Sequence, residues 1–152
     1  IGLFVSAGYG YQTLAGFTSS DLQSHASESS DAHTAFLQVT SLEEFNVELN
    51  KANAKGQTVM LDLYADWCVA CKEFEKYTFS DSRVKAALSE SVLIQIDLTD
   101  NSDVNIAFQD HFSILGLPSI LFFDTQGQEL SKARVTGFMR AEPFANHINN
   151  LF

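Results

Sequence analysis

Both cysteines of this 152-residue chain lie in one short stretch, Asp66-Trp67-Cys68-Val69-Ala70-Cys71-Lys72. The residues before it, 58–64, form a near-continuous apolar run, which is typical of a strand buried on both faces of a sheet. The residues after Cys68 predict a helix over 69–77. The cysteine pair therefore lies where a central strand ends and a helix begins.

This position favours a reactive thiol. A sulfur at a helix N-terminus faces unpaired backbone N–H groups and the positive end of the helix dipole, which stabilise the thiolate. Only the thiolate attacks a disulfide, so we expect Cys68 to be a nucleophile. Cys71 lies one turn further along, close enough to attack a mixed disulfide formed at Cys68. We therefore expect Cys71 to be the resolving thiol.

Three other uses of the pair fit the sequence less well. A structural disulfide closing a loop of about four residues would add only roughly 2 kcal/mol of stability. Haem attachment requires a histidine after the second cysteine, where Lys72 stands. A zinc site usually needs four ligands, and there is no second cysteine pair. The histidines lie in an expected linker or on separate expected helices: His25, His33, His111 and His147.

The rest of the pattern alternates strands and helices. Strands are expected at 36–39, 58–64, 92–98, 119–123 and 133–136, and helices at 42–52, 69–77, 81–89, 103–112 and from 140 onward. A capping box beginning at Thr40 or Ser41 can start the first helix, and Gly56 can close it. Residues 124–127 predict a hairpin turn. The predicted class is α/β, with a central mixed β-sheet and helices on both faces.

Length and composition indicate one domain with an N-terminal extension. We expect the domain at 35–152, preceded by a flexible, Ser-rich acidic linker at 18–34. Residues 1–17 are Gly-rich and aromatic, and are a possible end of a preceding membrane segment. No window has the roughly 18 consecutive apolar residues of a membrane-spanning helix. The chain starts at Ile1 without a signal-peptide pattern, so it looks like part of a longer protein.

The charge of the chain bears on its partners. The formal net charge is −10 and the sequence pI is near 4.6. Nucleic acids and anionic membrane surfaces would be repelled by such a surface. We therefore expect no nucleic-acid partner.

Two carboxylates are candidates for tuning the thiols. Asp62 interrupts the apolar strand six residues before Cys68, where a buried charge is costly. It is either a partly solvated acid at the strand end or a buried acid that raises the thiol pKa and moves protons. Glu75 lies four residues beyond Cys71 and projects to the same side of the helix, although an exposed glutamate there would need no special role.

Longer strings around these motifs resemble one family. They cover residues 59–75, 77–80, 115–118, 120–123 and 133–138. They resemble the C-terminal periplasmic domain of the DsbD family of bacterial thiol-disulfide interchange proteins, in the thioredoxin superfamily. The resemblance implies a thioredoxin fold at 35–152 and a role for Asp62 and Glu75 in tuning the active-site cysteines.

The resemblance also implies an electron relay. In that family a membrane-embedded domain receives electrons from cytoplasmic thioredoxin and passes them to this domain, which reduces the N-terminal periplasmic domain of the same protein. That domain then serves periplasmic disulfide isomerases and cytochrome c maturation factors. The implied activity is that of a protein-disulfide reductase in the bacterial inner membrane, with this domain in the periplasm. It needs no metal or organic cofactor beyond the Cys68–Cys71 disulfide.

A further signal is Gly116-Leu117-Pro118-Ser119, just before an expected strand. A proline there can be ordinary loop punctuation. Thioredoxin-like folds, however, place a cis-proline opposite the cysteines, where the neighbouring backbone can pair with an extended substrate strand. The resemblance therefore implies that Pro118 is cis and binds substrate together with Leu117. Trp67 and Tyr64 are expected to shield the sulfurs or shape the docking face.

Two alternatives remain open. One is a different thioredoxin-like disulfide oxidoreductase, including an oxidant, although the Val69-Ala70 dipeptide contains no histidine to stabilise a thiolate. The other is a non-catalytic binding module built on a thioredoxin fold. Two intact cysteines at a helix start argue against that module, and Cys68→Ala would leave a purely binding function unharmed.

Overall fold

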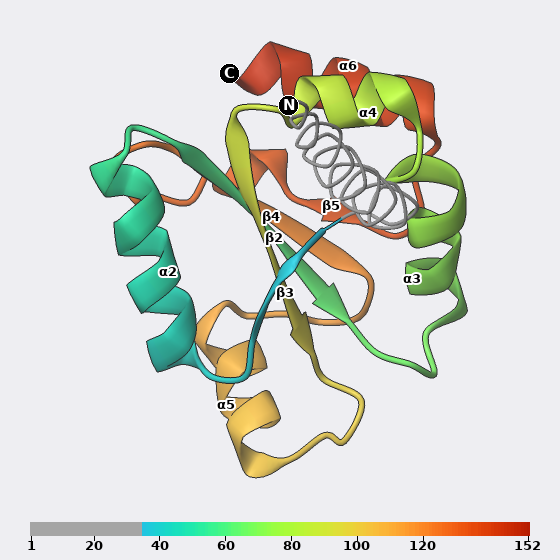
Figure 1. Ribbon diagram of the computed structural model, residues 1–152. Helices are drawn as coiled ribbons and strands as arrows, with labels where there is room; N and C mark the ends of the chain where they lie inside the picture. Colours follow the sequence, from blue (N-terminus) through green and yellow to red (C-terminus); the bar gives the residue numbers. More distant parts are fainter. Residues whose placement is uncertain (1–34) are drawn as a thin grey trace, which may run out of the picture. The chain divides into compact units, whose positions relative to one another are not determined.

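A computed structural model describes residues 35–152 of the chain. The possible membrane-segment end at 1–17 and the linker at 18–34 lie outside these residues. The described part contains a five-stranded sheet in the order β1-β3-β2-β4-β5 (Figure 1). Its strands are β1 (Leu37–Val39), β2 (Thr58–Tyr64), β3 (Ser91–Asp97), β4 (Ser119–Phe123) and β5 (Val135–Thr136).

The sheet is mixed, as predicted. β1 and β2 each pair with β3 in parallel, whereas β4 is antiparallel to both β2 and β5. β2 is central, and its residues from Val59 to Leu63 are all buried, which explains the near-continuous apolar run in the sequence. Its Cα register places Asp62 beside Gln95 of β3, so the buried polar residues of these two strands are neighbours.

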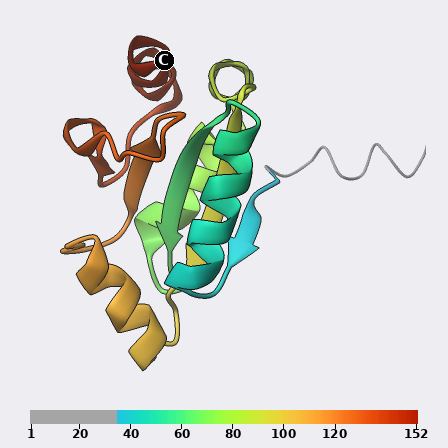
Figure 2. The same cartoon turned by 90° about the vertical axis from the view of Figure 1, so that its left-hand side faces the viewer.

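Helices cover both faces of the sheet (Figures 1 and 2). They are α2 (Leu42–Ala54), α3 (Val69–Glu73), α4 (Ser82–Ala87), α5 (Asp103–His111) and α6 (Ala141–Leu151). On one face, Phe45 of α2 and Phe108 of α5 pack with Leu61 of β2. On the other, Phe144 of α6 packs with Met60 of β2. Alternate residues of β2 thus supply two separate cores.

The first helix is capped in a way that differs from a simple capping box. Ser41 is the N-cap residue, and its hydroxyl accepts a hydrogen bond from the Glu44 N–H at 3.2 Å. The Glu44 carboxylate, however, accepts from the Thr40 N–H at 2.6 Å, one residue before the N-cap. Gly56 follows the end of the helix with a φ of 74°, in the left-handed conformation that glycine adopts readily.

Two sequence predictions need correction. The helix expected at 69–77 is an α-helix only to Glu73 and continues as a π-helical turn, η3 (Phe74–Thr78), which the Phe79 N–H closes on the Phe74 carbonyl at 2.8 Å. The strand expected at 133–136 is only Val135–Thr136. Residues Ser131–Ala133 form a 3₁₀ turn, η4, because the Ala133 N–H bonds to Leu130 at 2.8 Å instead of to a strand.

Candidate active site

The two cysteines occupy the first turn of α3. Cys68 is the N-cap residue, and its Sγ accepts a hydrogen bond from the Cys71 N–H at 3.1 Å. The two residues form a disulfide, with their Cα atoms 5.3 Å apart, and only 6% and 2% of their respective surfaces are exposed. When the pair is reduced, the same N–H and the helix dipole favour a thiolate on Cys68.

Asp62 lies on the face of β2 that carries Met60, which packs against Phe74 of η3. Its surface is only 3% exposed. Burial raises the pKa of the Asp62 carboxyl from 3.8 to about 7, and the charge of Glu75 adds to the rise, whereas a hydrogen bond from Gln95 opposes it. Near neutral pH this carboxyl can therefore both accept and release a proton.

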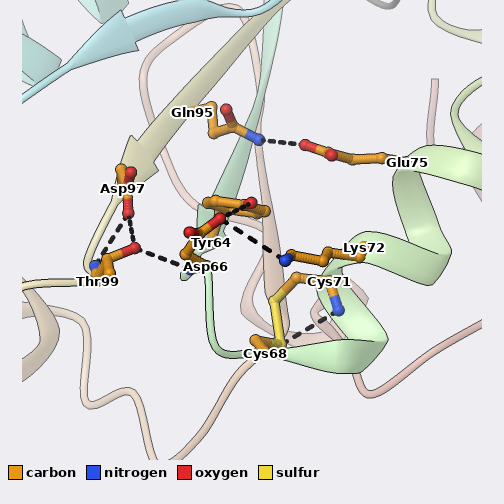
Figure 3. Close-up of polar contacts among 9 residues, drawn as sticks. All are labelled: Tyr64, Asp66, Cys68, Cys71, Lys72, Glu75, Gln95, Asp97 and Thr99. Atoms are coloured by element: carbon orange, nitrogen blue, oxygen red, sulfur yellow. Dashed lines mark hydrogen bonds and ion pairs between the residues drawn. A yellow bond between two sulfur atoms is a disulfide. The ribbon is translucent and has the colours of Figure 1, made fainter.

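Gln95 is a site residue that sequence reasoning missed. Its Nε2 donates to Asp62 Oδ2 at 2.8 Å and lies 3.4 Å from Glu75 Oε2, while its Oε1 accepts from Gln38 Nε2 at 2.7 Å. One buried amide thus joins the two predicted carboxylates. Figure 3 shows its contact with Glu75. A signal was present, since Gln95 interrupts the apolar strand at 92–98 as Asp62 interrupts its own.

Tyr64, Asp66 and Lys72 form a second polar group beside the cysteines. The Tyr64 hydroxyl donates to Asp66 Oδ1 at 2.9 Å, and Lys72 Nζ lies 3.8 Å from the same oxygen (Figure 3). Both ion-pair partners are more than half exposed, so the pair contributes little stability. Burial and the neighbouring carboxylate raise the pKa of Tyr64 to about 12, so its hydroxyl remains a donor at neutral pH.

The Leu117–Pro118 peptide bond is cis. Leu117 packs against Ala65 and the cysteine pair, and the Pro118 carbonyl accepts from the Gly137 N–H at 3.1 Å. The loop also lines a pocket of about 420 Å³ together with the edge of β5. The structure therefore brings Leu117 to the disulfide from a segment distant in sequence.

Trp67 stands beside Cys68 with 63% of its surface exposed. Its indole N–H donates to the Thr99 carbonyl at 3.2 Å. Among residues 35–152, no group of three or more His, Cys, Asp or Glu side chains is placed to hold a metal ion. Nor does this part of the chain contain a helix long and apolar enough to cross a membrane.

Comparison with known families accounts for this arrangement. The thioredoxin-like domain family matches residues 45–152, which is most of the chain. The chain belongs to the thioredoxin-like family. Cys68 and Cys71 are the CxxC-spaced cysteine pair of this thioredoxin-like chain, joined in a disulfide at a strand-to-helix junction.

The chain is also a homologue of DsbD. It is 62% identical over 151 residues to the thiol:disulfide interchange protein DsbD of Pseudoalteromonas atlantica, covering 99% of this chain and 25% of that protein. With DsbD of Escherichia coli K12 the identity is 56% over 118 residues, covering 78% of this chain and 20% of that protein. The chain thus spans a quarter or less of the length of these two relatives.

Solved thioredoxin-like structures agree. The oxidised C-terminal domain of DsbD from Neisseria meningitidis matches with a TM-score of 0.63 and 26% identity, covering 74% of this chain and 95% of that domain. A thioredoxin from Thermus thermophilus matches with a TM-score of 0.61 and 17% identity, covering 78% of this chain and 88% of that one, and so shares the fold. The chain therefore corresponds to the C-terminal thiol:disulfide interchange domain of DsbD, with its paired cysteines at Cys68 and Cys71.

Proposed function

We propose that this chain is the periplasmic C-terminal domain of a bacterial inner-membrane protein and works as a protein-disulfide reductase. It receives two electrons from a membrane-embedded domain, supplied upstream by thioredoxin, and passes them to an N-terminal periplasmic domain of the same protein. Disulfide isomerases or cytochrome maturation factors are the final acceptors. The observation that carries the proposal is a buried disulfide at the N-cap of α3, in a chain closely similar to proteins named for thiol:disulfide interchange.

The exchange follows from the positions of the sulfurs. The Cys68 thiolate attacks one sulfur of the partner disulfide, forming a mixed disulfide and releasing the other partner sulfur as a thiolate. Cys71 then loses its proton and attacks the Cys68 sulfur, which re-forms the disulfide of the domain and releases the second partner thiolate. Two protons pass to the partner sulfurs. The partner gains two electrons, and the domain loses two.

Asp62 is the proposed proton acceptor for this step. It is buried on the η3 side of β2, and its pKa of about 7 is suited to taking a proton at neutral pH. Glu75 accepts from the same donor, Gln95 Nε2, and so places a second carboxylate close to Asp62. Like charges near a thiol raise its pKa. The two acids thereby oppose the effect of the helix N-terminus and keep the pKa of Cys68 high in the free domain, which limits its reaction with unspecific disulfides.

The docking face is proposed to surround the cysteines. Tyr64 and Leu117 pack against the cysteine pair. Trp67 directly precedes Cys68 in the chain, and Pro118 follows Leu117 through a cis peptide bond. An extended partner strand can pair with the backbone beside Pro118, and its disulfide then faces Cys68.

The test uses the reduced chain and the oxidised N-terminal domain of the full-length protein. Both are mixed, quenched in acid, alkylated and weighed by mass spectrometry. We expect reduction of the N-terminal domain, a trapped mixed disulfide with Cys71→Ala, and none with Cys68→Ala. No transfer by the wild-type chain would contradict the relay, and trapping through Cys71 would reverse the two cysteine roles.

A further inference from the structure

Thr99, in the loop after β3, contacts the two residues that precede Cys68. Its Oγ1 accepts a hydrogen bond from the Asp66 N–H at 2.8 Å, and its carbonyl oxygen accepts from the Trp67 indole at 3.2 Å. Thr99 is separated from them by more than thirty positions in the chain. Figure 3 shows it reaching Asp66 from the end of β3.

The two residues that Thr99 contacts are not packed in the core. Ala65 and Cys68 are buried, but Asp66 and Trp67 between them are exposed. An exposed tryptophan has little packing to fix its ring, so hydrogen bonds decide its orientation. The indole N–H points to the Thr99 carbonyl, and the Asp66 backbone is bound to the Thr99 hydroxyl.

Asp97, at the end of β3, orients Thr99 in turn. Its Oδ1 accepts from the Thr99 N–H at 2.9 Å and from the Thr99 hydroxyl. A threonine hydroxyl has one proton to donate and lone pairs that accept. Because the Thr99 hydroxyl donates its proton in the hydrogen bond to Asp97, a lone pair of the hydroxyl oxygen is free to accept from the Asp66 N–H. Valine has the same shape but no hydroxyl, so it can bond neither to the Asp97 carboxylate nor to the Asp66 N–H through its side chain.

We propose that Thr99 is a positioning residue for thiol-disulfide exchange, which holds Asp66 and Trp67 so that the indole has a fixed place on the face where a protein disulfide docks. The inference deepens the proposed function and rests on it. Because Thr99 acts through Trp67 rather than on the sulfurs, its loss should affect a protein substrate and spare a small disulfide.

The experiment compares Thr99→Val with Thr99→Ser, which keeps the hydroxyl. Trp67 is the single tryptophan of the chain, so acrylamide quenching of its fluorescence reports this residue alone. Stopped-flow measurements give the rates at which each reduced protein reacts with insulin and with glutathione disulfide. Thr58→Val is the matched control, since it removes a threonine hydroxyl that bonds to Ser91 at 2.6 Å at the far end of β2.

We expect Thr99→Val to increase quenching of Trp67 and to lower the insulin rate about fivefold, the factor that one lost hydrogen bond brings. The glutathione disulfide rate, Thr99→Ser and Thr58→Val should match the wild type. An unchanged insulin rate, an equal loss with both disulfides, or a Thr99→Ser variant as impaired as Thr99→Val would each overturn the inference. If the wild-type chain reduced neither disulfide, the proposed function would fail instead, and the quenching comparison would still decide whether the Thr99 hydroxyl, through its bond to the Asp66 N–H, helps to fix Trp67.

Discussion

Asp62 couples the active site to folding. The pKa of its carboxyl is about 7 in the folded protein against an ordinary 3.8, so the folded state binds the extra proton between these values. The contribution of Asp62 to stability is therefore greatest below about pH 4 and falls as the pH rises toward 7, by as much as about 4 kcal/mol. Asp62→Asn should lack this loss, because the amide oxygen still accepts from Gln95 and carries no charge.

Urea unfolding of the two oxidised proteins at a series of pH values measures the difference, in which the contributions of the other acids cancel. We expect Asp62→Asn to gain stability relative to the wild type from pH 4 upward and to hold a constant advantage above about pH 7. Parallel stability curves for the two proteins would show that Asp62 titrates as an ordinary surface acid.

Gln95 is predicted to set the Asp62 pKa. Its hydrogen bond favours the charged carboxylate, so Gln95→Leu should raise that pKa further above its present value of about 7. Carboxyl carbon NMR titration measures this directly. Gln38→Leu is the control, since Gln38 Nε2 donates to the side-chain oxygen Oε1 of Gln95, not to Asp62, and its loss should leave the Asp62 titration nearly unchanged. A fall in the Asp62 pKa with Gln95→Leu would contradict the assigned role.

The site residues differ in how well their roles could be predicted from the sequence. The spacing of Cys68 and Cys71 at a strand-to-helix junction was enough to predict their role. Asp62 was predicted because a buried charge in an apolar strand is costly. Gln95 interrupts its own apolar strand in the same way, but its contact with Asp62 follows only from the register of the two strands. Thr99 gives no such signal, because its contacts with Asp66 and Trp67 depend on where the loop after β3 lies in space.

At the scale of the element, Gly56 is predicted to be needed for the end of α2. Its φ is 74°, and a Cβ there would meet nothing within 4 Å, so the cost of Gly56→Ala is conformational, about 1–2 kcal/mol of unfolding free energy. Gly116→Ala also has open space but lacks a positive φ, and should cost less. Urea unfolding midpoints at equal m-values compare the stabilities of the two variants. An equal loss of stability in Gly56→Ala and Gly116→Ala would contradict a conformational cost specific to Gly56.

Elements with their own local signals were predicted well. β2 and β4 have the predicted bounds because apolar runs end at clear turn residues. The π-helical turn η3 could not be predicted, since its hydrogen bond from Phe79 to Phe74 accompanies stacking of the two rings in the core, at 5.1 Å between centroids. Similarly, the shortened β5 depends on the turn around Ala133, which has no periodic pattern of its own.

At the scale of the whole molecule, the sheet order brings together residues from four segments. Asp62 and Tyr64 lie on β2, and the cysteines lie at the start of α3. Thr99 lies in the loop after β3, and the cis-proline lies in the loop before β4. Alternation of apolar runs predicted the mixed sheet with two helical layers. It did not predict which residues meet at the disulfide, because that depends on how β4 pairs with β2.

The central claim is that the Cys68–Cys71 disulfide is a reversible two-electron carrier. The most direct test equilibrates the protein in glutathione buffers of graded potential, traps free thiols by alkylation and reads the oxidised fraction by mass. We predict a reversible midpoint toward the thioredoxin end of the scale, nearer about −270 than about −120 mV. A midpoint near the oxidising end, or a pair that never exchanges, would contradict the assignment as a reductase.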